Sequence, residues 1–161
     1  MKKIVWYVLL FTLIIIIQLT IPPRTLHFDL FLVTIIVMGL IKGSKAGAWT
    51  GFIGGNIQDL FLGGMFGTYT IVKLIMGGLS GLLEKEFFKE NPVVPVATIF
   101  IASIFHGLLV ILITEELLFN INLFTALRQT ILPEAFFNSI AGIIIYYIVY
   151  RLERGGELYY G

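Results

Sequence analysis

The sequence has no cysteine, and only 13% of its 161 residues are charged. Without cysteine the chain can form no disulfide, no thiolate metal site and no thiol nucleophile. Common metal and phosphate motifs are missing as well, since no H-E-x-x-H pair occurs and the 17 glycines include no G-x-x-x-x-G-K-[ST] loop. A formal net charge of +1 argues against a broad electrostatic partner such as nucleic acid.

Apolar residues, by contrast, are abundant: 58% of the chain is hydrophobic and the mean hydropathy is +0.96. A bilayer core of about 30 Å needs roughly 20 helical residues, so the chain has room for six spans. The sequence therefore predicts an all-α, polytopic membrane protein with six transmembrane helices in a compact bundle, forming one domain over residues 1–161. The expected spans are residues 4–21, 26–41, 46–62, 66–83, 93–113 and 133–150. The first is too long and too uniformly apolar for a signal peptide, so we expect it to be retained.

Lysine and arginine are distributed unevenly between the two sides of this predicted bundle. Eight lie at the termini and in the connections after even-numbered spans: Lys2, Lys3, Lys42, Lys45, Lys85, Lys89, Arg151 and Arg154. Only Arg24 and Arg128 lie in the other connections. Because basic residues concentrate on the cytoplasmic side of a membrane, we expect both termini to be cytoplasmic. The connection 84–92, which carries charges of both signs, is then a solvated cytoplasmic loop.

The segment 115–132 is expected to lie outside the membrane core on the opposite side. It carries Leu123, Phe124, Leu127 and Ile131 at helical spacing. This spacing predicts an amphipathic helix that lies along the outer membrane surface.

Two neighbouring spans carry glycine at every fourth position, and each of these stripes ends in a charged residue. The first stripe is Gly47, Gly51, Gly55 and Asp59, and the second is Lys73, Gly77 and Gly81. Small residues let two membrane helices approach closely, so the stripes predict a tight helical hairpin. With a turn centred near residue 66, Asp59 is expected to face Lys73, Gly55 to face Gly77, and Gly51 to face Gly81.

Lys73 needs a specific explanation, because an ionisable residue inside the membrane costs about 2.5 to 3.5 kcal/mol on insertion scales. One interpretation is a structural ion pair with Asp59 that positions the two glycine-rich helices. The alternative is a proton or ion relay between the same two side chains.

The remaining polar residues form no catalytic pattern. Ser44 and Ser80 lie at the inner ends of their expected helices, whereas Asp59 and Lys73 lie toward the outside. A nucleophile with a neighbouring base is therefore not expected. For His106 we expect a hydrogen bond between helices. The sequence thus predicts no enzyme activity, no catalytic residue, no metal site and no cofactor.

A sequence signature begins within the first glycine stripe. Residues 51–59 read G-F-I-G-G-N-I-Q-D, with further glycines at positions 63, 64 and 67. This run resembles the G-F-x-x-G-x-x-x-D signature of the rod shape-determining MreD family. The length, the six expected spans, Asp29 at the start of the second span and the G-G-L-S-G run at 77–81 are similar to that family as well.

This resemblance implies a non-enzymatic scaffold of the bacterial cell-elongation complex, located in the cytoplasmic membrane. Its partner would be the membrane-anchored protein MreC. Through the complex it would serve a SEDS glycosyltransferase and a penicillin-binding transpeptidase that make peptidoglycan, together with MreB filaments. Because the two glycine stripes are expected to face each other, other residues are candidates for the partner surface: Asp29, Gly54, Gly78, Leu123, Phe124 and Leu127.

A second class is similar in size and architecture: the substrate-binding components of energy-coupling-factor vitamin importers. Those proteins use a small-x-x-x-small motif on their first helix to contact the coupling subunit, and the first span here has none. A vitamin site would also need several polar groups near the outer connections. This chain offers mainly Gln18, His27, Asp29, Asn120 and Asn122. Small-molecule import therefore stays the alternative function.

Overall fold

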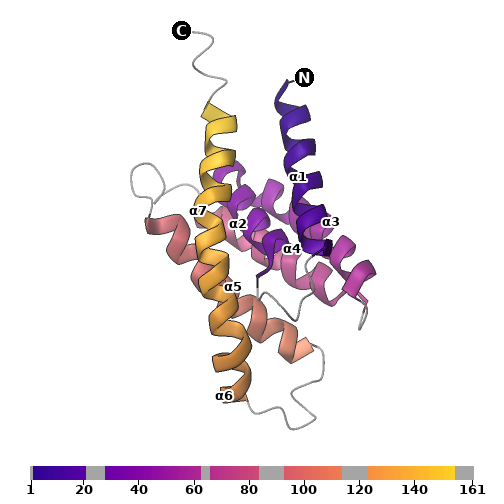
Figure 1. Cartoon of the computed structure of the whole chain (residues 1–161), viewed down its shortest axis with the longest axis vertical. Coiled ribbons are helices and arrows are strands. Elements are labelled where there is room, and N and C mark those ends of the chain that lie inside the picture. Colours follow the sequence, from indigo (N-terminus) through magenta and orange to yellow (C-terminus); the bar gives the residue numbers. More distant parts are fainter. Residues whose placement is uncertain (1, 21–27, 63–65, 84–92, 114–122, 155–161) are drawn as a thin grey trace.

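The computed structural model describes residues 2–20, 28–62, 66–83, 93–113 and 123–154. All regular structure in these residues is helical (Figure 1). The elements are α1 (Lys2–Thr20), α2 (Leu30–Lys42), α3 (Ser44–Leu62), α4 (Thr68–Ser80), the 3-10 turn η1 (Gly81–Leu83), α5 (Val93–Ile113), α6 (Leu123–Ala126), the π-helical turn η2 (Leu127–Ile131) and α7 (Leu132–Arg154). Each of the six predicted apolar stretches contains a helix, while α6 and η2 at 123–131 lie outside them, and the all-α class is confirmed.

Two helical segments, Val93–Ile113 and Leu123–Glu153, are long and apolar enough to cross a membrane by length and composition. Three others are apolar but shorter: Ile4–Thr20, Leu30–Lys42 and Thr68–Leu83. The number of six spans and the single domain therefore stay predictions. The connections at 22–27 and 84–92, the inter-helix residues 63–65 and the segment 114–122 lie outside the described residues, and so do His27, Asn120 and Asn122.

The central element is α2. Ten consecutive residues of this helix, from Phe31 to Leu40, are buried, and α1, α3, α4, α5 and α7 all contact it. A helix that is apolar on every side is stable only when neighbours surround it. Its 13 residues span only about 20 Å at about 1.5 Å per residue. The polar start of α2 is therefore enclosed by its longer neighbours.

The closest packing between two helices is that of α3 against α4. At Gly47, Gly51 and Gly55, an added Cβ would come within 3.0 Å of α4 backbone atoms, so the two backbones are in contact there. The register is not the predicted one: Gly47, rather than Gly55, lies against Gly77, a difference of eight residues. The same contact includes Gly39 of α2, which lies against Gly77 and Ser80.

Asp59 explains part of this register. Its carboxylate accepts hydrogen bonds from the backbone N–H groups of Tyr69 and Thr70, at 3.0 Å each, and from the Thr70 hydroxyl at 2.5 Å. These amides belong to the first turn of α4, whose N–H groups have no partner within the helix. The predicted Asp59–Lys73 ion pair is thus wrong, because Asp59 caps the start of α4.

The end of the chain differs from the prediction as well. Residues 123–131 do not form a separate surface helix, because α6, η2 and α7 follow one another without a break (Figure 1). Ile131 points inward, is 2% exposed and lies against Gly107 of α5. Leu123 and Phe124, by contrast, are exposed at the start of this long helix.

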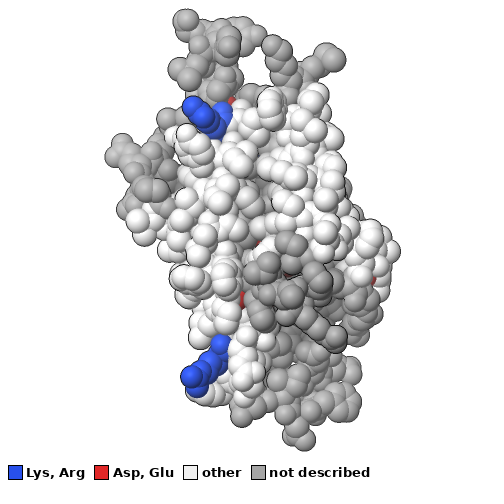
Figure 2. Space-filling model, viewed as in Figure 1, with Lys and Arg blue, Asp and Glu red and all other residues white. Residues whose placement is uncertain are grey.

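The surface of the molecule is mainly apolar. Large hydrophobic side chains of α1, α3, α4, α5 and α7 are exposed along the helices. Figure 2 shows one face on which Lys and Arg lie toward the two ends, while the described surface between them is almost entirely uncharged. This pattern is the one expected for a protein surrounded by lipid.

Polar contacts at one end of the molecule join α1, α2 and α7. The Tyr7 hydroxyl donates a hydrogen bond to the Glu153 carboxylate, and Lys42 pairs with the same carboxylate at 3.0 Å. The Lys42 ammonium also lies 4.2 Å from the centre of the Tyr7 ring. The first and last described helices are thereby joined to α2 where α2 ends.

Candidate functional site

Buried polar side chains gather where α2 begins. They come from five helices: Asp29 precedes α2, Gln58 lies on α3, Lys73 on α4, Ser103 and His106 on α5, and Glu134 and Asn138 on α7. We call this set the polar cluster. All of its members except Glu134, which is partly exposed, are buried.

Asp29 is the centre of the polar cluster. One carboxylate oxygen, Oδ1, accepts from the backbone N–H of Leu32 at 2.9 Å and so caps α2. The other oxygen, Oδ2, lies 2.5 Å from the Lys73 ammonium and accepts from the Gln58 amide at 3.3 Å. A single carboxylate therefore both starts the central helix and joins α2 to α3 and α4.

Lys73 is the counterpart of Asp29. Its side chain has no exposed surface, and its ammonium lies 5.6 Å from the centre of the Phe31 ring and 6.0 Å from that of Tyr69. A fully buried ammonium is tolerated only when a hydrogen-bonded counter-charge meets it. The structure thus places the intramembrane ion pair between Lys73 and Asp29 instead of Asp59.

Asn138 extends the polar cluster to the last two long helices. Its side-chain oxygen accepts from the Asp29 backbone N–H at 2.8 Å, and its amide donates to the Ser103 hydroxyl at 3.0 Å. The same side chain hydrogen-bonds Glu134, one turn earlier on α7. One amide thereby joins α7 to both α2 and α5.

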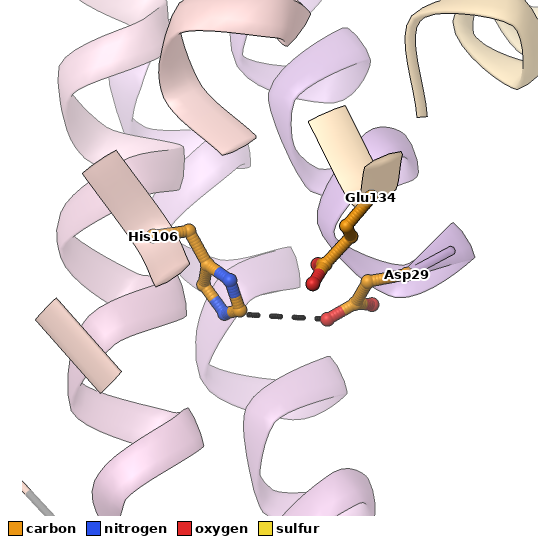
Figure 3. A group of neighbouring side chains, drawn as sticks. All are labelled: Asp29, His106 and Glu134. Carbon is orange, nitrogen blue, oxygen red and sulfur yellow. Dashed lines mark ion pairs between the residues drawn. The ribbon is translucent and has the colours of Figure 1, made fainter. Parts of the chain in front are cut away.

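His106 has two buried ring nitrogens without a partner. The residue is 3% exposed, and neither nitrogen has a hydrogen-bond partner among the described residues, where Oε1 of Gln58 also lacks one. Its Nε2 lies 4.0 Å from Oδ2 of Asp29, beyond hydrogen-bond distance. Figure 3 shows the side chains of His106, Asp29 and Glu134 converging from three different elements. The hydrogen bond predicted for His106 is therefore not formed.

The same three side chains have the donor atoms of a metal site. One atom from each of Asp29, His106 and Glu134 lies within 4.8 Å of the other two. The Lys73 ammonium, however, already lies against Asp29 Oδ2, and a metal ion would have to displace it. The polar cluster also forms no nucleophile and base pair among the described residues, because Ser103 accepts from Asn138 and His106 has no partner.

Two of the residues proposed for a partner surface lie inside the protein. Asp29 is 5% exposed, and Gly54 lies against Phe31 and Ile35 of α2. These two expectations are wrong, because the short central helix occupies the space that a partner would need. Gly78 differs, since an added Cβ would meet only the Ala48 side chain, at 3.9 Å.

Two apolar grooves lie on the outside of the bundle. The α3/α4 groove has a cavity volume of about 340 Å³ and is lined by Lys45, Ala48, Trp49, Phe52 and Leu74. The α1/α7 groove is larger, about 600 Å³, and is lined by Trp6, Leu9, Leu10, Leu13, Tyr147, Ile148, Arg151 and Leu152.

The family model described as rod shape-determining protein MreD matches residues 1–155, almost the whole chain. The chain belongs to the MreD family. MreD proteins are membrane components of the bacterial cell-shape complex and are not a known enzyme family. The resemblance carried by residues 29–81 is thus confirmed over a much longer stretch. No curated protein and no solved structure matches the chain significantly, and the expected likeness to vitamin-importer components stays a prediction.

Sequence reasoning found only part of the polar cluster of this MreD protein. Lys73 is recognisable as a charge inside an apolar stretch. Asp29 carries a signal for its capping role that the prediction does not include. An aspartate directly before an apolar helical run is a typical N-cap. Glu134 and Asn138 on α7 and Ser103 on α5 were overlooked, because nothing in the sequence indicates which faces of distant helices meet.

Proposed function

We propose that this MreD protein is a non-enzymatic scaffold of the cell-elongation complex that binds the membrane helix of an MreC-like protein. The observation that carries the proposal is the family match over residues 1–155. The structure adds support, because the hydrogen bonds and the ion pair of Asp29, Lys73 and Asn138 hold helices together. What the protein presents to partners is mainly apolar helix surface.

The α3/α4 groove is the surface that we propose for the partner helix. Ala48 provides a small side chain there, and Gly78 of α4 lies next to Ala48, while Trp49, Phe52 and Leu74 form higher walls. Helices associate in lipid through close packing over small residues, since no hydrophobic force drives them together. The inward-facing glycines of α3 are already in contact with α4, which leaves this outward face for another helix.

An outer rim contact completes the proposed interface. Leu123 and Phe124 are exposed and Leu127 is partly exposed at the start of the last long helix. The start of α1 and the end of α7 lie together at the other end of the molecule (Figure 1). With the basic residues of the sequence, this supports cytoplasmic termini and an extracytoplasmic position for α6. There α6 would meet the extracytoplasmic segment next to the partner's membrane helix.

In this proposal the MreC-like protein links the scaffold to the enzymes of peptidoglycan synthesis. A SEDS glycosyltransferase, a penicillin-binding transpeptidase and MreB filaments would be partners through the complex. Loss of the protein is expected to round a rod-shaped cell without lowering the activity of the purified synthases.

The test is co-purification of the MreC-like protein from membranes in mild detergent. Gly78→Leu adds bulk beside Ala48 of the α3/α4 groove, where an added Cβ meets no backbone, so we expect at least a tenfold lower recovery of the partner, about 1.4 kcal/mol of binding. The matched control is Leu9→Trp, which fills the α1/α7 groove and should leave recovery unchanged. Equal recovery with Gly78→Leu and wild type would contradict the proposed surface. A tightly bound vitamin without the partner would favour the importer alternative.

A further inference from the structure

The charges of the polar cluster do not balance. Lys73 contributes one positive charge, whereas Asp29 and Glu134 are two carboxyl groups whose oxygens lie within 4.8 Å of one His106 nitrogen. With His106 neutral and both carboxyls ionised, the cluster would hold one excess negative charge. A net charge is unfavourable in the interior of a membrane protein.

No other described group facing the cluster supplies the missing charge. On α3, Gln58 is neutral, and Asp59 adds a further negative charge that is engaged by the first turn of α4. Tyr69 of α4 lies beside His106, with ring centres 6.3 Å apart, and is neutral. On α1, Gln18 is neutral as well and hydrogen-bonds the backbone of Phe28 and Leu30.

The ring of His106 provides a second observation, which is independent of the charge balance. A neutral imidazole has one N–H donor and one acceptor nitrogen, and both nitrogens are buried here without a partner among the described residues. Buried polar atoms of this kind are rare, and each one calls for an explanation such as an ion that is not present. The ring points toward the two carboxyl groups (Figure 3).

We propose that the polar cluster is a binding site for one proton, held between His106 and Glu134 next to the Asp29–Lys73 pair. One added proton cancels the excess charge. It also supplies a hydrogen bond to one of the two imidazole nitrogens, whether a protonated Glu134 donates to the imidazole or an imidazolium donates to the Glu134 carboxylate. Such a proton belongs to the coupled pair rather than to either side chain.

A metal ion fits the same atoms less well. A divalent cation would turn one excess negative charge into one excess positive charge and would approach the Lys73 ammonium at Asp29. A proton adds one charge and needs no ligand exchange. The bound proton would join α5 to α7 at the level where Asn138 already joins α7 to α2.

The test is a pH titration of the full-length protein in lipid nanodiscs. The chain has two histidines, so ¹⁵N-histidine spectra of a His27→Gln background report on His106 alone. We expect the His106 signals to show one pH-dependent transition. The infrared band of the Glu134 carboxyl group should change with the same midpoint, whether the proton lies on Glu134 or on His106. In Glu134→Gln we expect that band to be lost and the proton affinity of His106 to change at least tenfold.

The matched control is Glu153→Gln, a carboxylate near the other end of α7, which should leave both signals unchanged. If Glu134→Gln does not fold, Glu134→Asp should still move the midpoint. The proposal is overturned if the His106 and carboxyl signals stay constant over the whole pH range, or if the transition is the same in the Glu134 variants. Stoichiometric Zn²⁺ binding that is lost in His106→Ala would also overturn it, in favour of a metal site.

Discussion

Lys73 can be fully buried because its ammonium meets a carboxylate that the fold holds in place for a second reason. Asp29 caps α2 through Oδ1 and pairs with Lys73 through Oδ2, so the ion pair needs no flexible partner. Asp59 lies closer in the sequence but is engaged by the amides of Tyr69 and Thr70. Lys73 therefore pairs with Asp29 and not with Asp59 because of the hydrogen bonds that these two carboxylates make at the starts of α2 and α4.

Asp29→Asn should be far more damaging than Asp59→Asn. Asparagine at 29 can still accept from Leu32, but it leaves the Lys73 ammonium buried without a counter-charge, at a cost of about 3 to 5 kcal/mol. Asparagine at 59 keeps one acceptor oxygen for the first turn of α4 and leaves no buried charge unpaired, so we expect a smaller loss of about 1 kcal/mol. Thermal unfolding of the purified proteins in detergent measures both.

The double variant Asp29→Asn with Lys73→Met separates the charge from the packing. Removing both members of a buried pair can be neutral, so the double variant should recover most of the stability lost in Asp29→Asn. Additive losses would contradict the pairing of these two side chains.

At the scale of the elements, the helices could be predicted from the sequence but their register could not. Apolar runs between polar or glycine-containing connections set the helices, and the observed bounds lie close to the expected ones. The hairpin register was predicted from the symmetry of two glycine stripes alone. The actual register also satisfies the capping of α4 by Asp59 and the contact with Gly39 of α2, a third helix that the two stripes do not reveal.

Leucine substitutions at Gly51 and at Gly78 should differ strongly in their effect on stability. Gly51→Leu places a side chain where a Cβ would already collide with the backbone of Lys73, so α3 and α4 must move apart. We expect a loss of about 3 kcal/mol or more, at or beyond the upper end of overpacking costs. At Gly78 an added Cβ meets only the Ala48 side chain, so Gly78→Leu should change stability by less than about 1 kcal/mol. The measurement is again thermal unfolding, and similar values for the two variants would contradict the observed register.

At the scale of the whole molecule, polarity is arranged with apolar side chains outward and a polar cluster inside. Composition alone predicts the apolar exterior, because a chain with 58% hydrophobic residues and 13% charged residues cannot cover itself with charge. The polar interior could not be predicted in the same way. Its members are separated by up to 109 residues, as for Asp29 and Asn138, and only the three-dimensional arrangement brings them together.

The orientation in the membrane is the last property that belongs to the whole molecule, and a labelling experiment tests it. The chain has no cysteine, so single cysteines can be introduced at Ser44, at the start of α3, and at Thr125, which is exposed on α6. Basic residues concentrate at the end of the bundle that contains Ser44, so this end should be cytoplasmic. We expect an impermeant maleimide to label Thr125→Cys in intact cells, and to label Ser44→Cys only after the cells are permeabilised. The cysteine-free parent controls for background, and permeabilised cells show that both cysteines can react. Labelling of Ser44→Cys in intact cells would reverse the orientation and would move the proposed rim contact of Leu123 and Phe124 to the cytoplasmic side.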